Sequence, residues 1–282
     1  MTASPLPEDV RAAIAAMPVE YQPLLADVRD VLAADPRFLA LFLGGSIGRG
    51  VADAGSDLDL LVTVSDADFD TVARELAGIL VATVDPVITL AIPGMPGTNA
   101  YTTRQGLRVD VVLERIADLD EPAFRRRVTV FDRGDVRALI SPVEDANAGP
   151  DAATLGAIVQ EFLRQQAIYP AAVVGREDWL LGQEGVHNAR LMLYQLFVET
   201  NQPLPVMGVK QWTSKLTSAQ RSVLEALDPP TAGREQVMAA MAAVRSAFRT
   251  SGRAAAEAAG MTWPIEIDDA IAACWKRNGL VD

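Results

Sequence analysis

Residues 43–60 (LGGSIGRGVADAGSDLDL) combine a glycine-rich turn with two closely spaced acids. Residues 57–64 are expected to form a strand, and successive residues of a strand point to opposite faces, so Asp57 and Asp59 are expected to share one face. Two neighbouring carboxylates repel unless a cation lies between them, and Mg²⁺ is usually held by one or two carboxylates plus substrate phosphates. Gly45 would let backbone amides approach a phosphate, and Ser46 could donate a hydrogen bond to it. The pattern predicts metal-assisted phosphate chemistry.

A third acid, Asp110, stands among valines in the segment LRVDVVL (107–113). A carboxylate buried among valines is costly without a metal, a donor or solvent. If its strand lies beside the strand of Asp57 and Asp59, Asp110 can join the same metal site or accept a proton from an attacking group. A Gly-Ser turn alone is common, and an acid at a strand start often only caps a turn. The complete set is more specific, and no P-loop or dinucleotide-binding motif competes with it.

The candidate site residues must be held in place by strands that end or begin next to them. Apolar, β-branched and turn residues predict strands over 38–43, 57–64, 83–92, 101–103 and 107–113. Helical spacing predicts helices over 8–34, divided by Pro18 and Pro23, and over 66–80.

The second half of the chain has a helical pattern. Helices are expected over 152–169, 177–200, 218–227, 233–259 and 264–277, with Asp151 and Ser218 as N-caps and Pro170 and Gly260 as stops. We therefore expect an α+β protein with two domains: residues 1–147, a mixed catalytic domain with N-terminal helices, and residues 148–282, a helical domain that completes the substrate cleft.

The charge balance narrows the class of substrate. The 282 residues contain 25 Lys and Arg and 37 Asp and Glu, a formal net charge of −12. Apart from Arg125–Arg127 the basic residues are scattered, whereas proteins that grip nucleic-acid backbones present a basic stripe. We therefore expect no polymeric nucleic acid as partner. With no secretion signal, no apolar span and one cysteine, Cys274, a cytoplasmic location without membrane contact is expected.

Gly45-Ser46 followed by Asp57-Leu58-Asp59 and the later Asp110 resembles the nucleotidyltransferase superfamily that includes DNA polymerase beta. The layout is similar to the bacterial aminoglycoside and lincosamide nucleotidyltransferases. The resemblance is strongest over residues 38–115, and 208–212 and 215–216 add to it more loosely. It implies a mixed sheet with flanking helices followed by helices, ATP or another NTP as donor, Mg²⁺ as metal, and pyrophosphate as second product.

The resemblance also implies residue roles. Ser46 would touch the donor's terminal phosphates, with Gly45 beside it, and Asp57 and Asp59 would hold metal. Asp110 would be the third carboxylate, as ligand or base. Arg49, in the loop after Ser46, would reach a phosphate or remain solvated.

The helical half offers further candidates. Lys210 and Lys215 would neutralise the triphosphate, or else are surface lysines. Glu184 would be the general base, or else a solvated helix residue, and the single histidine, His187, is expected to be structural. The four tryptophans are expected to pack between helices, although one or two could line an acceptor pocket.

The leading hypothesis is therefore transfer of AMP from ATP to a hydroxyl or amine of a small molecule. An aminoglycoside-like or lincosamide-like acceptor would make the protein an antibiotic-resistance enzyme. Two alternatives stay open: a protein acceptor, as in toxin–antitoxin pairs, and a nucleotide-binding regulatory protein without transfer activity. The oligomeric state is not predicted.

Overall fold

The computed structural model describes residues 5–119, 125–143, 149–205, 207–208 and 210–280. It divides into two compact units, which we describe separately: residues 1–145 with 206–209, and residues 146–205 with 210–282. The boundary predicted between residues 147 and 148 falls outside the described residues. Among the described residues, no helix is long and apolar enough to cross a membrane.

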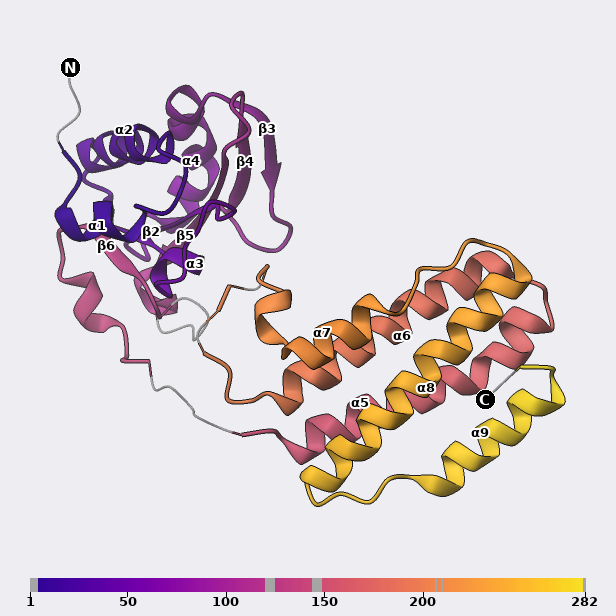
Figure 1. Ribbon diagram of the computed structural model, residues 1–282. Coiled ribbons are helices and arrows are strands. Elements are labelled where there is room, and N and C mark those ends of the chain that lie inside the picture. Colours follow the sequence, from indigo (N-terminus) through magenta and orange to yellow (C-terminus); the bar gives the residue numbers. More distant parts are fainter. Residues whose placement is uncertain (1–4, 120–124, 144–148, 206, 209, 281–282) are drawn as a thin grey trace. The chain divides into compact units, whose positions relative to one another are not determined.

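The first unit contains a six-stranded sheet with strand order β3-β4-β5-β2-β1-β6 (Figure 1). The strands are β1 (Phe38–Leu43), β2 (Leu58–Val64), β3 (Pro86–Ala91), β4 (Asn99–Thr103), β5 (Arg108–Arg115) and β6 (Val128–Asp132). β2 and β5 are parallel, whereas the other neighbouring strands are antiparallel. The sheet is therefore mixed, as predicted.

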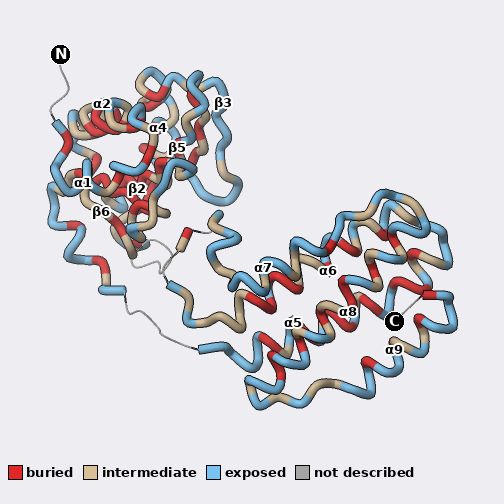
Figure 2. The backbone as a smooth tube through the Cα atoms, in the orientation of Figure 1, coloured by how far each residue is buried: buried red, intermediate tan, exposed pale blue. Residues whose placement is uncertain are grey.

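Helices cover one face of this sheet. They are α1 (Glu8–Ala13), α2 (Tyr21–Ala34) and α4 (Phe69–Val84); the short elements α3 (Gly45–Gly48), η1 (Ile116–Asp118) and η3 (Val136–Leu139) complete the unit. Alternate residues of β2, Leu58, Leu60 and Val62, are fully buried in the core beneath the helices. Leu61 belongs to a smaller apolar cluster on the opposite face, which also includes Phe42 and Ile140. Red segments in Figure 2 mark the buried positions.

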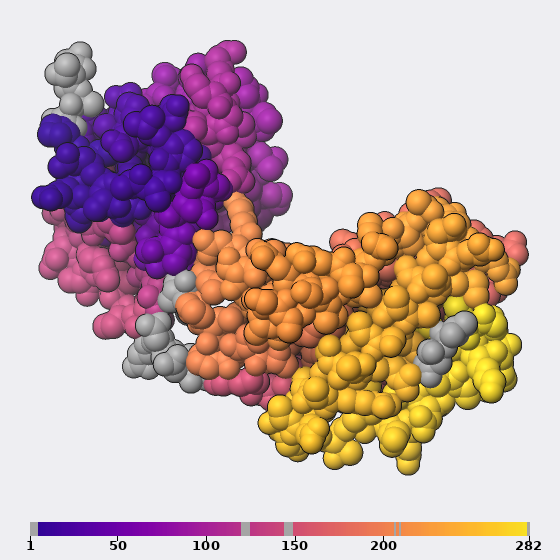
Figure 3. Space-filling view, viewed as in Figure 1, coloured from indigo at the N-terminus to yellow at the C-terminus, as the bar shows by residue number. Residues whose placement is uncertain are grey.

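The second unit is helical. Its elements are α5 (Ala152–Tyr169), η4 (Pro170–Val174), α6 (Trp179–Thr200), η5 (Thr213–Lys215), α7 (Ser218–Glu225), α8 (Arg234–Ala258) and α9 (Ile265–Arg277). Phe162 of α5 and Phe248 of α8 stack with ring centroids 3.6 Å apart in its core. Atoms of α8 and α9 lie at the surface on the face seen in Figure 3. A mixed sheet with flanking helices followed by a helical part confirms the predicted fold class.

Several local predictions need correction in the first unit. β2 begins at Leu58, so Asp57 belongs to the preceding loop. α4 continues to Val84, which places Thr83 in a helix, and not in a strand, before the left-handed Asp85 (φ 43°) ends it. β6 was not predicted, because its five residues lie among charged neighbours, and pairing with β1 stabilises it.

Two helix ends of the second unit also differ from prediction. Thr217, and not Ser218, caps α7, because the side chains of Thr217 and Gln220 form a reciprocal capping box. Pro170 ends the regular hydrogen bonding of α5, yet the chain continues in a π-helical turn to Val174. Asp151 caps α5 as predicted, accepting hydrogen bonds from the amides of Ala153 and Thr154.

Candidate active site

Asp59 and Asp110 lie side by side in the sheet. β2 and β5 are paired in parallel, and the register places Asp59 opposite Asp110. Neighbouring strands are about 4.8 Å apart, and residues opposite each other in a ladder share a face of the sheet. Both acids are half-buried, whereas Leu58 and Val109 point into the main core. The tertiary fold thus brings together two carboxylates that are 51 positions apart in the sequence (110 − 59).

Asp57 has a different local setting. It precedes β2, and its carboxylate lies 3.8 Å from the guanidinium of Arg108 at the start of β5. Its side chain is only 16% exposed. Within the described residues, no group of three His, Cys, Asp or Glu side chains is arranged to hold a metal ion.

The turn after β1 packs directly on Asp59. The amide of Gly44 donates to the backbone carbonyl of Asp59 (2.9 Å), which ties the end of β1 to β2. Gly45 has a φ of +54°, and a Cβ atom there would collide with the carboxylate of Asp59. Glycine is required at position 45 for two reasons, the backbone conformation and the closeness of Asp59.

Replacing Gly45 by alanine should therefore displace the Asp59 carboxylate and abolish nucleotide-dependent activity. Gly106→Ala is the matched control, because Gly106 also has a positive φ (+79°) but nothing lies within 4 Å of the added Cβ. Both variants should lose about 1–2 kcal/mol of unfolding free energy from the backbone strain. Pyrophosphate release measured beside thermal unfolding separates the two effects: equal activity losses in both variants would contradict the role of the collision.

Ser46 and Arg49 contribute buried donors to the same turn. The Oγ of Ser46 and the Nε of Arg49 are both buried, and neither has a hydrogen-bond partner within the described part of the chain. A buried polar atom without a partner costs free energy. Because Oγ can donate and Nε–H must donate, an anionic oxygen near the turn would satisfy them.

The turn at Gly45–Ser46 and the acids Asp59 and Asp110 all lie within one segment that matches a known protein family. Residues 28–128 match a family model described as a nucleotidyltransferase domain. The chain contains a nucleotidyltransferase domain. The nucleotidyltransferase domain predicted from the Gly-Ser and Asp-x-Asp motifs is thereby confirmed for residues 28–128, and this domain makes the chain an enzyme. The nucleotidyltransferase domain includes Gly45, Ser46, Asp59 and Asp110.

Solved structures give weaker similarities. One is an aminoglycoside 6-adenyltransferase from Bacillus subtilis, with 12% identity, a TM-score of 0.42, and coverage of 91% of this chain and 97% of that one. Another is a nucleotidyltransferase-like protein from Exiguobacterium sibiricum, with 16% identity, a TM-score of 0.34, and coverage of 81% and 75%. A third is E. coli CdnC with ATP, with 14% identity, a TM-score of 0.27, and coverage of 80% and 89%. No curated protein matches this sequence.

The remaining predicted site residues belong to the second unit. Glu184 and His187 are exposed on α6, Lys210 is exposed ahead of η5, and Lys215 is the last residue of η5. The first unit, which holds Asp59 and Asp110, contains none of them. Their roles stay predictions.

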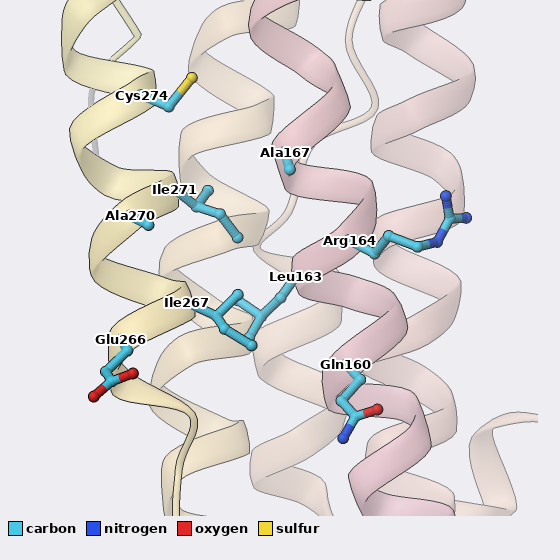
Figure 4. Close-up of a pocket in the computed structure, with 9 residues that line it drawn as sticks. All are labelled: Gln160, Leu163, Arg164, Ala167, Glu266, Ile267, Ala270, Ile271 and Cys274. Carbon is cyan, nitrogen blue, oxygen red and sulfur yellow. The ribbon is translucent and has the colours of Figure 1, made fainter.

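Two cavities of the second unit differ in chemistry from the candidate active site. One, of about 300 Å³, is lined by His187 and by Trp212, which is 50% exposed and stacks on Tyr194 at 4.0 Å. Trp275, by contrast, is fully buried, as expected for a packing residue. The other cavity, of about 750 Å³, is an apolar groove between α5 and α9, where Leu163 and Ile267 point toward each other (Figure 4).

Proposed function

We propose that the nucleotidyltransferase domain transfers AMP from ATP to a hydroxyl or amine of a small molecule and releases pyrophosphate. The observation that carries this proposal is the parallel register of Asp59 with Asp110, together with the packing of Asp59 directly against Gly45. Carboxylates beside a phosphate-binding turn are the two parts that metal-assisted phosphoryl chemistry needs.

The donor set fits Mg²⁺. Asp59 and Asp110 supply hard oxygen ligands from adjacent strands, and Mg²⁺ needs only one or two protein carboxylates when substrate phosphates and water complete its shell. We propose Asp57 as an additional ligand, which would have to give up its contact with Arg108. When bound, Mg²⁺ would neutralise the charge of the triphosphate.

The chain's own residues would prepare the reaction. Ser46 and Arg49 would donate to phosphate oxygens of ATP, with Lys210 and Lys215 as further cations. The acceptor oxygen or nitrogen forms a bond to the α-phosphorus, the bond from this phosphorus to the bridging oxygen breaks, and pyrophosphate leaves with that oxygen. The acceptor's proton would pass to a carboxylate, either Asp110 or Glu184.

A small acceptor agrees with the charge of the chain. A net charge of −12 disfavours a nucleic-acid polymer and suits a cationic compound, such as an aminoglycoside-like or lincosamide-like molecule. An antibiotic acceptor would make the enzyme a resistance determinant. We place the reaction in the cytoplasm, with ATP as donor.

The test is pyrophosphate release from each NTP in the presence of a panel of aminoglycosides and lincosamides. We expect release with ATP and Mg²⁺, complete loss on addition of EDTA, and recovery when Mg²⁺ is restored. Labelling of a cell lysate with tagged ATP provides the second arm. Labelled protein bands would show that the acceptor is a protein and not a small molecule. ATP binding without pyrophosphate release in either arm would contradict transfer and favour a regulatory nucleotide-binding protein.

A further inference from the structure

A buried ion pair lies on the same face of the sheet as Asp59 and Asp110. Arg127 donates to Glu114 through Nη1 (2.8 Å to Oε2) and Nη2 (3.3 Å to Oε1). The two side chains are 0% and 5% exposed. Burial raises the pKa of Glu114 above its ordinary value, although the hydrogen bond from Arg127 opposes this effect. Replacing a buried ion pair by apolar residues is often neutral or stabilising, so a gain in stability does not by itself explain this pair.

The position of Glu114 links the pair to the candidate active site. Glu114 follows Asp110 by four residues within β5, so strand alternation places both on one face. The guanidinium of Arg127 also lies over the ring of Phe42 in β1, 5.0 Å from its centroid. Since β2 lies between β5 and β1 in the sheet, Arg127 connects the strand of Asp110 to the strand that leads into the Gly45–Ser46 turn.

The residue before Arg127 touches that turn. The carbonyl oxygen of Arg126 occupies the space where a side chain at Gly48 would begin. Gly48 is the last residue of α3, and its amide donates to the carbonyl of Gly44 (2.7 Å). Only a hydrogen at position 48 allows this approach. The backbone at Arg126 therefore supports α3, which contains Ser46.

We propose that Glu114 and Arg127 are positioning residues for nucleotide binding. Their ion pair holds the backbone of Arg126 against Gly48, and this contact keeps Ser46 where it meets the phosphates of the NTP. The inference rests on the proposed function and adds two residues that lie outside the predicted site. The sequence contained a signal for one of them, because Arg127 belongs to the single cluster of basic residues, 125–127.

The experiment disrupts the contact between Arg126 and Gly48 in two independent ways. The double variant Glu114→Leu/Arg127→Met removes the pair without leaving a lone buried charge, and Gly48→Ala pushes Arg126 away while the pair stays intact. Gly78→Ala is the control, because Gly78 lies in α4 with nothing within 4 Å of the added Cβ. Calorimetry measures the Kd for ATP with Mg²⁺ and without acceptor, steady-state kinetics gives KM and kcat, and denaturation gives stability.

In both test variants we expect the Kd and KM for ATP to rise about tenfold, the effect of weakening one charge-assisted hydrogen bond, with kcat at saturating ATP nearly unchanged. Gly78→Ala should bind ATP like the wild type. A purely structural role would move the denaturation midpoint and leave the Kd alone. If the double variant does not fold, Gly48→Ala alone decides the question.

The outcomes separate this proposal from the proposed function. Folded variants that bind ATP within twofold of the wild type would overturn the positioning role, whatever their activity. Wild-type ATP binding without pyrophosphate release, together with weaker binding by the variants, would overturn the transfer reaction and support the positioning role. A wild-type chain that binds no NTP would overturn both.

Discussion

Replacing Asp59 by asparagine should lower the rate of pyrophosphate release by about 10³-fold, with little change in fold. Asparagine keeps the shape of the side chain and removes its charge, so the contact with Gly45 remains while the proposed metal ligand is weakened. A loss of about 4 kcal/mol of transition-state stabilisation corresponds to this factor. The measurement is kcat/KM for the best acceptor found, with circular dichroism as a check on folding.

The control for Asp59→Asn is Asp70→Asn. Asp70 is exposed in the first turn of α4, within the same nucleotidyltransferase domain, and the substitution makes the same change in net charge. It should retain full activity. Asp110→Asn should resemble Asp59→Asn, because the two acids are partners in the β2–β5 register. If Asp59→Asn keeps a tenth or more of wild-type activity, Asp59 does not hold the metal.

Asp268→Asn should destabilise the helical unit by about 3–5 kcal/mol, the usual cost of breaking a buried ion pair from one side. The Asp268 side chain is 0% exposed. Its oxygens accept hydrogen bonds from Arg245 and Arg249 (2.9 Å each), from Arg253 (3.0 Å) and from the indole of Trp263 (3.0 Å). Removing the charge leaves these arginines of α8 without their common anion. Chemical denaturation of the full chain measures the loss.

Asp269→Asn is the matched control, since Asp269 is the exposed neighbour of Asp268 on α9, and its stability should equal that of the wild type. Acidification gives a second check. Burial alone would raise the pKa of Asp268, but the hydrogen bond from Trp263 and the charges of Arg249 and Arg245 outweigh it, and the pKa falls below 3.8. The stabilisation is therefore present above pH about 4 and is lost as the pH falls further. A stability difference between wild type and Asp268→Asn that persists undiminished well below that pH would contradict this account.

Local patterns predicted the elements that bury a whole face or carry a clear cap. The apolar run 38–43 is β1, and 152–169 is α5, with Asp151 at its N-cap. Prediction was weaker where contacts with other residues decide whether a strand forms or which residue caps a helix. β6 is short and becomes a strand by pairing with β1, and Thr217 replaces Ser218 as the cap of α7 because Gln220 completes the capping box.

The sequence by itself determined the family of the first domain. A Gly-Ser turn, two acids in alternation and a later acid among valines predicted a nucleotidyltransferase domain, and the family model confirms the domain over residues 28–128. The tertiary structure alone decided which of them meet. The parallel register places Asp59 beside Asp110, whereas Asp57 lies in the loop near Arg108. It also joined Glu114 to Arg127, since strand order and close packing bring together residues that no local periodicity connects.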